Sequence, residues 1–309
     1  MKKWFFCIGI VGIFLLGGCT ENASQEPSGE KKKITVVSAL FPLYDFAKQI
    51  GGNSVEAYLL LPPGTEPHDF EPTPSDISKI KNADVFLYTG DIMEPWVHDV
   101  LEGVHATGKT VDTSARILLM EESSHEDKQN PEGMDPHIWL NFENAQKMAE
   151  DIADAFLEVD PKNADYYRNN LEILQANLSK LDAKYKSTLV GCTTNTIIYG
   201  GHYAFGYLAK QYGLQYKALQ GFSPDSEPSA KDLVEMVNQI QKENISSVFS
   251  EELSNPKIAE MLAQETHTHL FSLNPAENIT RKDYTNGVSY LSIMEENLKN
   301  LSLGLQCEK

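Results

Sequence analysis

The stretch 55–72, VEAYLLLPPGTEPHDFEP, joins a strand-like apolar run to a loop that carries one histidine. Residues 55–61 are mostly apolar, and the prolines that follow end the regular structure. His68 lies in the loop between two prolines. Three carboxylates are close to it in sequence, those of Glu66, Asp69 and Glu71. The pattern predicts an imidazole held at the end of a buried strand, with the carboxylates in surface or helix-capping roles.

Short strand-like and helix-like segments alternate along the rest of the chain. In the first half, strands are predicted at 34–40, 55–61, 83–89 and 110–112, and helices at 44–50, 75–81, 94–102 and 143–157. In the second half, strands are predicted at 196–199, 216–220, 247–250 and 270–273, and helices at 204–212, 229–242, 256–265 and 283–301. This alternation is typical of an α/β fold with mostly parallel sheets, whose ligands bind at the carboxyl ends of the strands.

One longer helix is predicted between the two halves. Asp160 and Pro161 form a helix start, and apolar residues then recur at spacings of three and four. These residues are Tyr167, Leu171, Leu174, Leu178, Leu181 and Tyr185. A helix over 161–189 is about 40 Å long, enough to cross two small α/β domains at 34–160 and 190–309. A coiled-coil dimer seam is the alternative explanation of the same spacing.

The first residues have the features of an export signal. Two lysines precede the apolar run 4–16, which is shorter than the roughly 20 residues of a membrane-spanning helix. Gly17 and Gly18 precede Cys19, as in a bacterial lipoprotein cleavage site. We therefore expect a signal peptide at 1–18, lipidation of Cys19 and a flexible tether at 19–33. An uncleaved N-terminal anchor is the alternative. Either arrangement places the domains outside the cytoplasm and tethers them to a membrane.

Charge and cysteine content narrow the possible partners. The 309-residue chain has a formal net charge of −18, which becomes −20 once the two lysines of the signal are removed. Nucleic acid is therefore excluded as an expected partner. Cys7 leaves with the signal and Cys19 is used for lipid, so Cys192 and Cys307 remain as a pair. Outside the cytoplasm such a pair is expected to form a disulfide, and two free buried thiols are the alternative.

Three histidines occupy equivalent positions. His68, His137 and His202 each follow a strand-like run or begin a helix, and each stands beside proline or glycine. An α/β sheet gathers such segments at one edge. Imidazole ligands suit zinc, copper, nickel and iron, and one carboxylate completes a tetrahedral zinc shell. We therefore expect a metal site where these segments meet.

The motifs around these histidines resemble those of a known family. Residues 67–72 (PHDFEP), residues 135–141 (DPHIWLN) and Gly201-His202 followed by 205–208 (FGYL) are similar to the solute-binding lipoproteins of zinc and manganese ABC importers, the cluster A-I metal-binding proteins. The similarity extends from Ile34 through the rest of the chain. It implies two α/β domains joined by one long rigid helix, with the metal site in the cleft between the domains.

The resemblance also implies a ligand set. It assigns metal binding to His68, His137 and His202, and to Glu277, which follows the segment 273–276 (LNPA). Manganese members replace the third histidine by glutamate and use aspartate as the fourth ligand, so His202 favours zinc. Zinc members often carry a histidine-rich loop. Here the polar loop 121–133 contains only His125, which favours a solvated loop over an auxiliary capture site.

The function implied is capture of extracellular Zn²⁺ by a monomer and delivery to a membrane permease with a cytoplasmic ATPase. A manganese carrier is the nearest alternative, and an adhesin with structural zinc is another. A zinc hydrolase is the rival from the enzyme class. The chain contains no H-E-x-x-H, G-x-S-x-G or P-loop motif, and a shell closed by four protein ligands leaves no position for a catalytic water. We therefore expect a binding protein.

Overall fold

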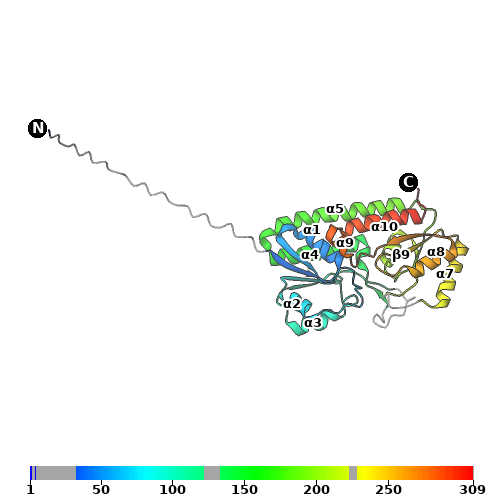
Figure 1. Ribbon diagram of the computed structural model, residues 1–309, viewed down its shortest axis with the longest axis horizontal. Coiled ribbons are helices and arrows are strands. Elements are labelled where there is room, and N and C mark those ends of the chain that lie inside the picture. The colour runs from blue at the N-terminus through cyan, green and yellow to red at the C-terminus, as the bar shows by residue number, and fades with distance from the viewer. Residues whose placement is uncertain (2–3, 5–32, 122–132, 223–227, 309) are drawn as a thin grey trace. The chain divides into compact units, whose positions relative to one another are not determined.

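The computed structural model describes residues 33–121, 133–222 and 228–308, together with Met1 and Trp4. The predicted signal, Cys19 and the tether as far as residue 32 otherwise lie outside the described residues, as do His125 and the rest of 122–132. Lys33–Lys309 form one compact unit. It contains two four-stranded parallel sheets, which confirms the predicted α/β class (Figure 1).

The first sheet has the strand order β2-β1-β3-β4. Its strands are β1 Ile34–Ser38, β2 Val55–Leu59, β3 Val85–Tyr88 and β4 Lys109–Asp112. Val36 on the inner strand β1 pairs with Ala57 on one side and Val85 on the other. Because helices cover both faces of such a sheet, its inner strands are continuous apolar runs rather than alternating ones.

The second sheet repeats this design with the order β10-β9-β7-β8. Its strands are β7 Thr196–Tyr199, β8 Gln215–Ala218, β9 Ser247–Glu251 and β10 His269–Leu273. A short antiparallel ribbon, β5 Met120–Glu121 with β6 Met134–Asp135, precedes His137. The residues that follow β2, β6, β7 and β10 therefore carry the four predicted ligands.

Ten α-helices and three short 3₁₀ turns occur in the described part of the chain. The helices of the first half are α1 Phe41–Gly51, α2 Pro74–Asn82, α3 Trp96–Val104 and α4 Phe142–Val159, with turns η1 Gly52–Ser54 and η2 Ile138–Leu140. The others are α5 Ala164–Leu189, α6 Gly206–Tyr212, α7 Ala230–Glu243, α8 Lys257–Thr266, α9 Arg281–Asn286 and α10 Tyr290–Gly304, with turn η3 Pro161–Asn163.

The helices form layers on the two sheets. Ile80 of α2 and Val97 of α3 pack on one face of the first sheet with Val37 and Phe86. Helix α1 contacts β1 and β2, and α4 contacts β3 and β4. On the second sheet, α7 and α8 cover one face through an apolar cluster that includes Ile198. Helix α10 packs against β9 and β10.

The long helix α5 runs along both halves of the unit (Figure 1). It packs against α1 and α4 of the first half and against α6 and α10 of the second. Of its predicted apolar stripe, five residues are buried and Leu171 is half-buried. The prediction of one helix that joins two sheet domains is therefore confirmed, while the exact division at 34–160 and 190–309 stays a prediction.

Most predicted helices differ from the observed ones by a few residues at their ends, and two of the differences have a clear physical reason. The helix expected at 161–189 starts at Ala164, because Pro161–Asn163 form a separate 3₁₀ turn and the Asp160 carboxylate accepts hydrogen bonds from Asn163 Nδ2 and Tyr167 OH. The single closing helix predicted at 283–301 was wrong. It is α9 followed by α10, and Gly287 ends α9 in the left-handed region with φ +70°.

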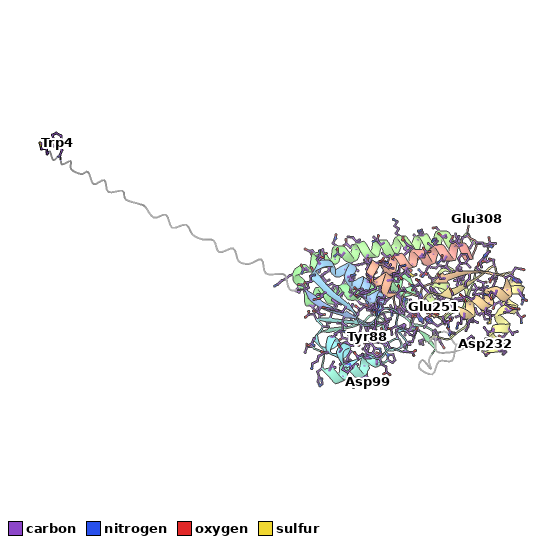
Figure 2. The ribbon with its side chains drawn as sticks, viewed as in Figure 1. Trp4, Tyr88, Asp99, Asp232, Glu251 and Glu308 are labelled. Atoms are coloured by element: carbon purple, nitrogen blue, oxygen red, sulfur yellow. A yellow bond between two sulfur atoms is a disulfide. The ribbon has the colours of Figure 1, made fainter. Side chains whose placement is uncertain are left out.

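The cysteine pair joins the tail to the start of the second half. Cys192 and Cys307 form a disulfide, and backbone hydrogen bonds from Thr193 to Gln306 and from Thr194 to Leu305 support it at 3.2 Å each. In the described part of the chain no helix has the length and apolar character needed to cross a membrane. Exposed acidic side chains such as Asp99 and Asp232 lie on the outside of the unit, whereas Glu251 lies between the two halves (Figure 2).

Candidate metal centre

His68 is held by a loop that starts where β2 ends. Thr65 N–H donates to the Pro62 carbonyl at 3.0 Å, and His68 N–H donates to Glu66 Oε1 at 3.2 Å. His68 Nε2 is buried and has no hydrogen-bond partner among the described residues. Burial lowers the pKa of His68 to about 3, and the nearby Glu277 opposes this only in part. The imidazole is therefore neutral and has a free nitrogen lone pair.

His137 follows β6 after Pro136 and is completely buried. Asp135 Oδ1 accepts the His137 backbone N–H at 2.9 Å and lies 2.7 Å from the ring Nδ1. This contact fixes the ring and leaves Nε2 directed toward the other ligands. Burial opposes a charge on His137, but the carboxylates of Asp135 and Glu277 outweigh burial and raise its pKa.

His202 stands at the carboxyl end of β7 after Gly200 and Gly201. Glu251, the last residue of β9, accepts the His202 backbone N–H at 3.2 Å and lies 2.9 Å from Nδ1. A Cβ on Gly201 would come within 3 Å of both Glu251 and Tyr199, so only glycine lets this carboxylate approach. Burial lowers the pKa of His202, but the carboxylates of Glu251 and Glu277 raise it more. The pKa of His202 is therefore well above its usual value.

Glu277 lies on the loop between β10 and α9. This loop is held by three hydrogen bonds: Ala276 N–H to Asn274 Oδ1 at 2.7 Å, Trp139 Nε1 to the Pro275 carbonyl at 2.7 Å, and Phe41 N–H to the Glu277 carbonyl at 3.1 Å. Burial alone would raise the pKa of Glu277, but His202 and His137 hold it well below its usual value.

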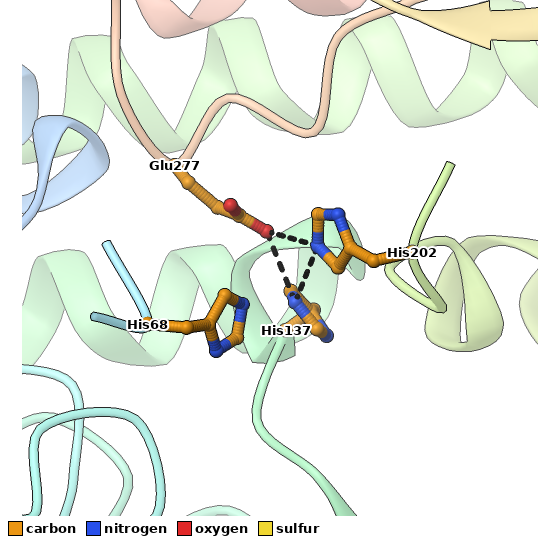
Figure 3. A group of neighbouring side chains, drawn as sticks. All are labelled: His68, His137, His202 and Glu277. Atoms are coloured by element: carbon orange, nitrogen blue, oxygen red, sulfur yellow. Dashed lines mark hydrogen bonds and ion pairs between the residues drawn. The ribbon is translucent and has the colours of Figure 1, made fainter. Parts of the chain in front are cut away.

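The four side chains converge on one point between the two sheets (Figure 3). Glu277 Oε1 lies 2.9 Å from His202 Nε2 and 3.0 Å from His137 Nε2, and the two ring nitrogens are 3.2 Å apart. All four potential ligand atoms lie within 4.8 Å of one another. In a tetrahedral shell with bonds of about 2.1 Å, ligand atoms are about 3.4 Å apart. The group therefore has the composition and size to hold one divalent ion.

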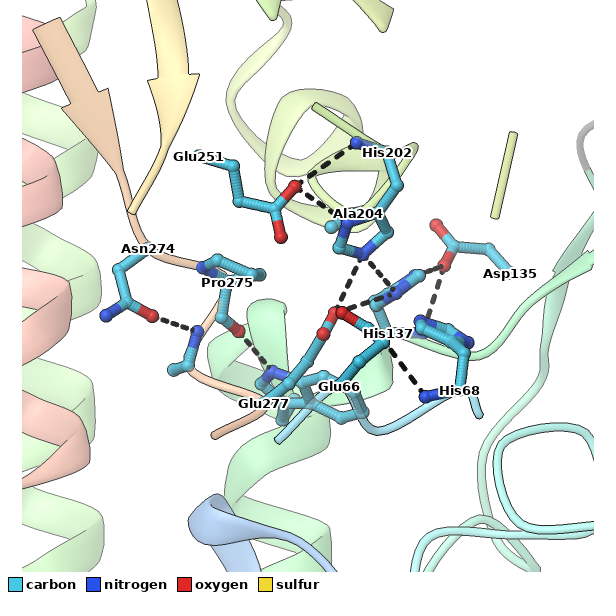
Figure 4. Close-up of polar contacts among 12 residues, drawn as sticks. Glu66, His68, Asp135, His137, His202, Ala204, Glu251, Asn274, Pro275 and Glu277 are labelled. Atoms are coloured by element: carbon cyan, nitrogen blue, oxygen red, sulfur yellow. Dashed lines mark hydrogen bonds and ion pairs between the residues drawn. The ribbon is translucent and has the colours of Figure 1, made fainter. Parts of the chain in front are cut away.

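All four sequence-predicted residues are thus brought together, and His137, His202 and Glu277 are at most 3% exposed. One expectation about their surroundings needs correction. Glu66 is not a surface group. It is half-buried near Glu277 (Figure 4). Burial is the main cause that raises the pKa of Glu66 to about 7, and repulsion from the Glu277 carboxylate is the second. Asp69 and Glu71 are exposed, as expected.

Sequence reasoning missed the carboxylates that hold the two buried rings. Asp135 lies within the quoted motif but has no predicted role, and Glu251 has none although it directly follows the strand predicted at 247–250. The rule that places ligands at the carboxyl ends of strands could have found it. His267 and His269, which are outside the group, are exposed.

Two α/β lobes with parallel sheets bring together three imidazoles and one carboxylate, a donor set typical of metal-binding proteins. The family model described as "ZnuA: Zinc-uptake complex component A periplasmic" matches residues 36–304. The chain belongs to this family.

Individual relatives agree with that assignment. The chain is 36% identical to the high-affinity zinc uptake system protein ZnuA of Bacillus subtilis (strain 168), with 97% of each chain covered. It is 34% identical to the zinc-binding lipoprotein AdcA of Streptococcus pneumoniae (strain ATCC BAA-255 / R6), covering 97% of this chain but only 60% of that longer relative. The Zn(II)-bound ZnuA-like domain of Streptococcus pneumoniae AdcA has a similar structure, with a TM-score of 0.77 at 33% identity over 89% of this chain and 99% of that one.

Proposed function

We propose that this protein captures Zn²⁺ outside the cytoplasm and delivers it to a membrane permease driven by a cytoplasmic ATPase. The observation that carries the proposal is the buried group His68, His137, His202 and Glu277. Three nitrogen ligands favour zinc over manganese, which prefers oxygen. The name of the family and the names of its zinc-binding relatives support the same ion.

The closed shell also distinguishes a carrier from an enzyme. Catalytic zinc keeps one coordination position for water or substrate, whereas three imidazoles and a carboxylate fill a tetrahedral shell. The family is one of zinc-uptake components, which favours carriage over the hydrolase alternative. Cobalt substitution tests this directly: a spectrum of four protein ligands supports carriage, and a bound water that titrates contradicts it.

Membrane attachment is the finer part of the proposal. We expect lipid on Cys19 to anchor a monomer at the extracellular face of the cell membrane, with residues 19–33 as a tether. The relatives that are named lipoproteins support this arrangement. Mass spectrometry of the native protein is expected to show a diacylated N-terminal cysteine. The Cys19→Ala variant is expected to be released into the medium.

Metal analysis and competition test the central claim. Protein purified without added metal is expected to contain about one zinc per chain, and excess manganese should not displace it. His202→Ala should lose more affinity than the 10–100-fold typical of a change outside the ligand shell. His269→Ala, an exposed histidine at the start of β10, is the matched control and should bind zinc normally. Full zinc affinity in His202→Ala would contradict the proposed site.

The dependence on pH provides a second test. Zinc must displace protons from His137 and His202, whose pKa values are raised in the metal-free group. Zinc affinity is therefore expected to fall as pH decreases, and the fall should begin at a pH above about 6.5, the reference pKa of imidazole. Calorimetry in buffers of different ionisation enthalpy should show proton release on zinc binding at neutral pH. Affinity that stays constant between about pH 5.5 and 8 would contradict a site with three histidines.

A further inference from the structure

The residue after Glu277 makes an unusual set of contacts. Asn278 is 1% exposed, and its Nδ2 donates to the carbonyls of Pro62 at 2.9 Å and Thr65 at 2.6 Å. Its Oδ1 accepts the backbone N–H of Ile279 at 2.8 Å. Both hydrogens of the amide and its oxygen are therefore used. The side chain connects the loop of one sheet to the loop of the other.

The loop that Asn278 contacts has little internal support. Between β2 and α2 it contains four prolines before Pro74, none of which can donate a backbone hydrogen bond. Its described backbone–backbone hydrogen bonds join Thr65 to Pro62 and Phe70 to Pro67, and its His68 N–H donates to Glu66 Oε1. Pro62 and Thr65 are exposed at the surface, so the two bonds from Asn278 tie an otherwise solvated turn to the protein interior.

His68 depends on this loop more than the other rings depend on theirs. Asp135 and Glu251 hold the Nδ1 atoms of His137 and His202 from the side. For His68 the described contacts are its own backbone bond to Glu66 and the neighbouring imidazole rings, whose centroids lie 5.3 and 5.4 Å away. Its place in the group is therefore set mainly by the backbone of the loop.

We propose that Asn278 is a positioning residue for metal binding: it ties the His68 loop to the Glu277 loop so that ligands from the two sheets reach one ion together. This inference rests on the proposed zinc function. Since Asn278 adjoins Glu277, one backbone segment supplies the ligand Glu277 and also holds the loop that carries the ligand His68. Loss of the amide should free His68 and speed the release of zinc, without changing any ligand.

A double-mutant cycle tests this role. Zinc affinity and dissociation rate are measured by chelator competition for the wild type, Asn278→Ala, His68→Ala and the double variant. We expect Asn278→Ala to weaken binding about tenfold or more in the wild-type background, the range of a change outside the ligand shell. In the His68→Ala background it should have no further effect, because the ligand that it positions is already gone.

Controls separate this effect from a general loss of structure. Asn170→Ala removes a comparable bond, in which Asn170 Nδ2 on α5 donates to the Ile50 carbonyl at 2.9 Å. Ile50 is about 14 Å along α1 from Phe41, the residue that contacts the Glu277 carbonyl. Asn170→Ala should leave zinc binding unchanged. If Asn278→Ala does not fold, Asn278→Ser keeps one donor and is expected to show a smaller loss of the same kind.

The outcomes distinguish the two levels of the proposal. Suppose that the wild type binds zinc normally. If Asn278→Ala then lowers zinc affinity equally in both backgrounds, or not at all, the positioning role alone is overturned. A wild-type protein that does not bind zinc overturns the proposed function and this inference together. A loss confined to the background that contains His68 supports both.

Discussion

Glu251 and Asp135 determine how two of the three imidazoles face the metal position. Each carboxylate lies within 2.9 Å of a ring Nδ1 and also accepts the backbone N–H of the same histidine. A carboxylate in this position fixes the tautomer and makes the other nitrogen a better ligand. We expect Glu251→Gln, which keeps the shape but removes the charge, to lower zinc affinity about 10–100-fold.

The control for this change is Glu260→Gln, an exposed glutamate on α8. It should bind zinc as the wild type does. Isothermal competition with a chelator of known affinity measures both variants. Equal affinities for Glu251→Gln and the wild type would show that the buried charge does not act through His202.

A buried carboxyl in the first lobe makes stability depend on pH. Glu94 accepts the backbone N–H groups of Thr89 at 3.0 Å and Gly90 at 3.1 Å, yet burial outweighs these bonds and raises its pKa from 4.5 to about 8. Because the folded-state pKa is the higher one, the contribution of Glu94 is fully present below about pH 4.5 and is lost as pH rises through 8.

Glu94→Gln is therefore expected to remove a fall in the free energy of unfolding between about pH 4.5 and 8. The slope from one such group is at most about 1.4 kcal/mol per pH unit. Urea denaturation of metal-free protein at several pH values measures it. A variant with the same slope as the wild type would contradict the raised pKa of Glu94.

At the level of elements, α5 is the structure that both lobes share. Leu178 lies on its buried stripe and is not exposed at all, within an apolar cluster that also contains Phe46 of α1 and Leu298 of α10. Leu178→Ala should lower the free energy of unfolding by about 2–5 kcal/mol. Because the cluster extends through both lobes, we expect a single unfolding transition.

The exposed Ile173 on the same helix provides the comparison, since Ile173→Ala should change stability by less than about 0.5 kcal/mol. Denaturation followed by tryptophan fluorescence and by circular dichroism measures both variants. Two separate transitions in Leu178→Ala would show that the lobes unfold independently.

The elements also show what the sequence could predict and why the rest escaped it. Strand ends beside proline or glycine were enough to single out His68, His137 and His202. Glu277 needed the family motif, because one glutamate after a strand carries no signal of its own. Glu251 reaches His202 only through the pairing of β9 with β7. The break between α9 and α10 was missed because an apolar helix pattern tolerates one glycine, and only the left-handed φ of Gly287 reveals the stop.

At the level of the whole molecule, the disulfide closes most of the second lobe into a loop. Cys192 and Cys307 are 115 residues apart in sequence. By the chain-entropy account, a cross-link over a loop of this length stabilises the fold by about 4–5 kcal/mol. The paired variant Cys192→Ser with Cys307→Ser is expected to lose stability of this order.

Zinc affinity should stay unchanged in that variant, because Cys192 precedes the amino end of β7 while His202 follows its carboxyl end. Reductant should destabilise the wild type and leave the serine variant unaffected. Equal stability of the two proteins under oxidising conditions would contradict the cross-link.

The four proposed ligands come from four separate loops in both lobes, so the unfolded chain contains no preformed site. Any ion bound at this point therefore favours the folded state, by about 4.1 kcal/mol when the free ion is at 1,000 times its dissociation constant. The resistance of the protein to proteolysis then depends on the concentration of the zinc that it binds. Under zinc starvation the empty form would be degraded faster, and its abundance would have to be maintained by synthesis.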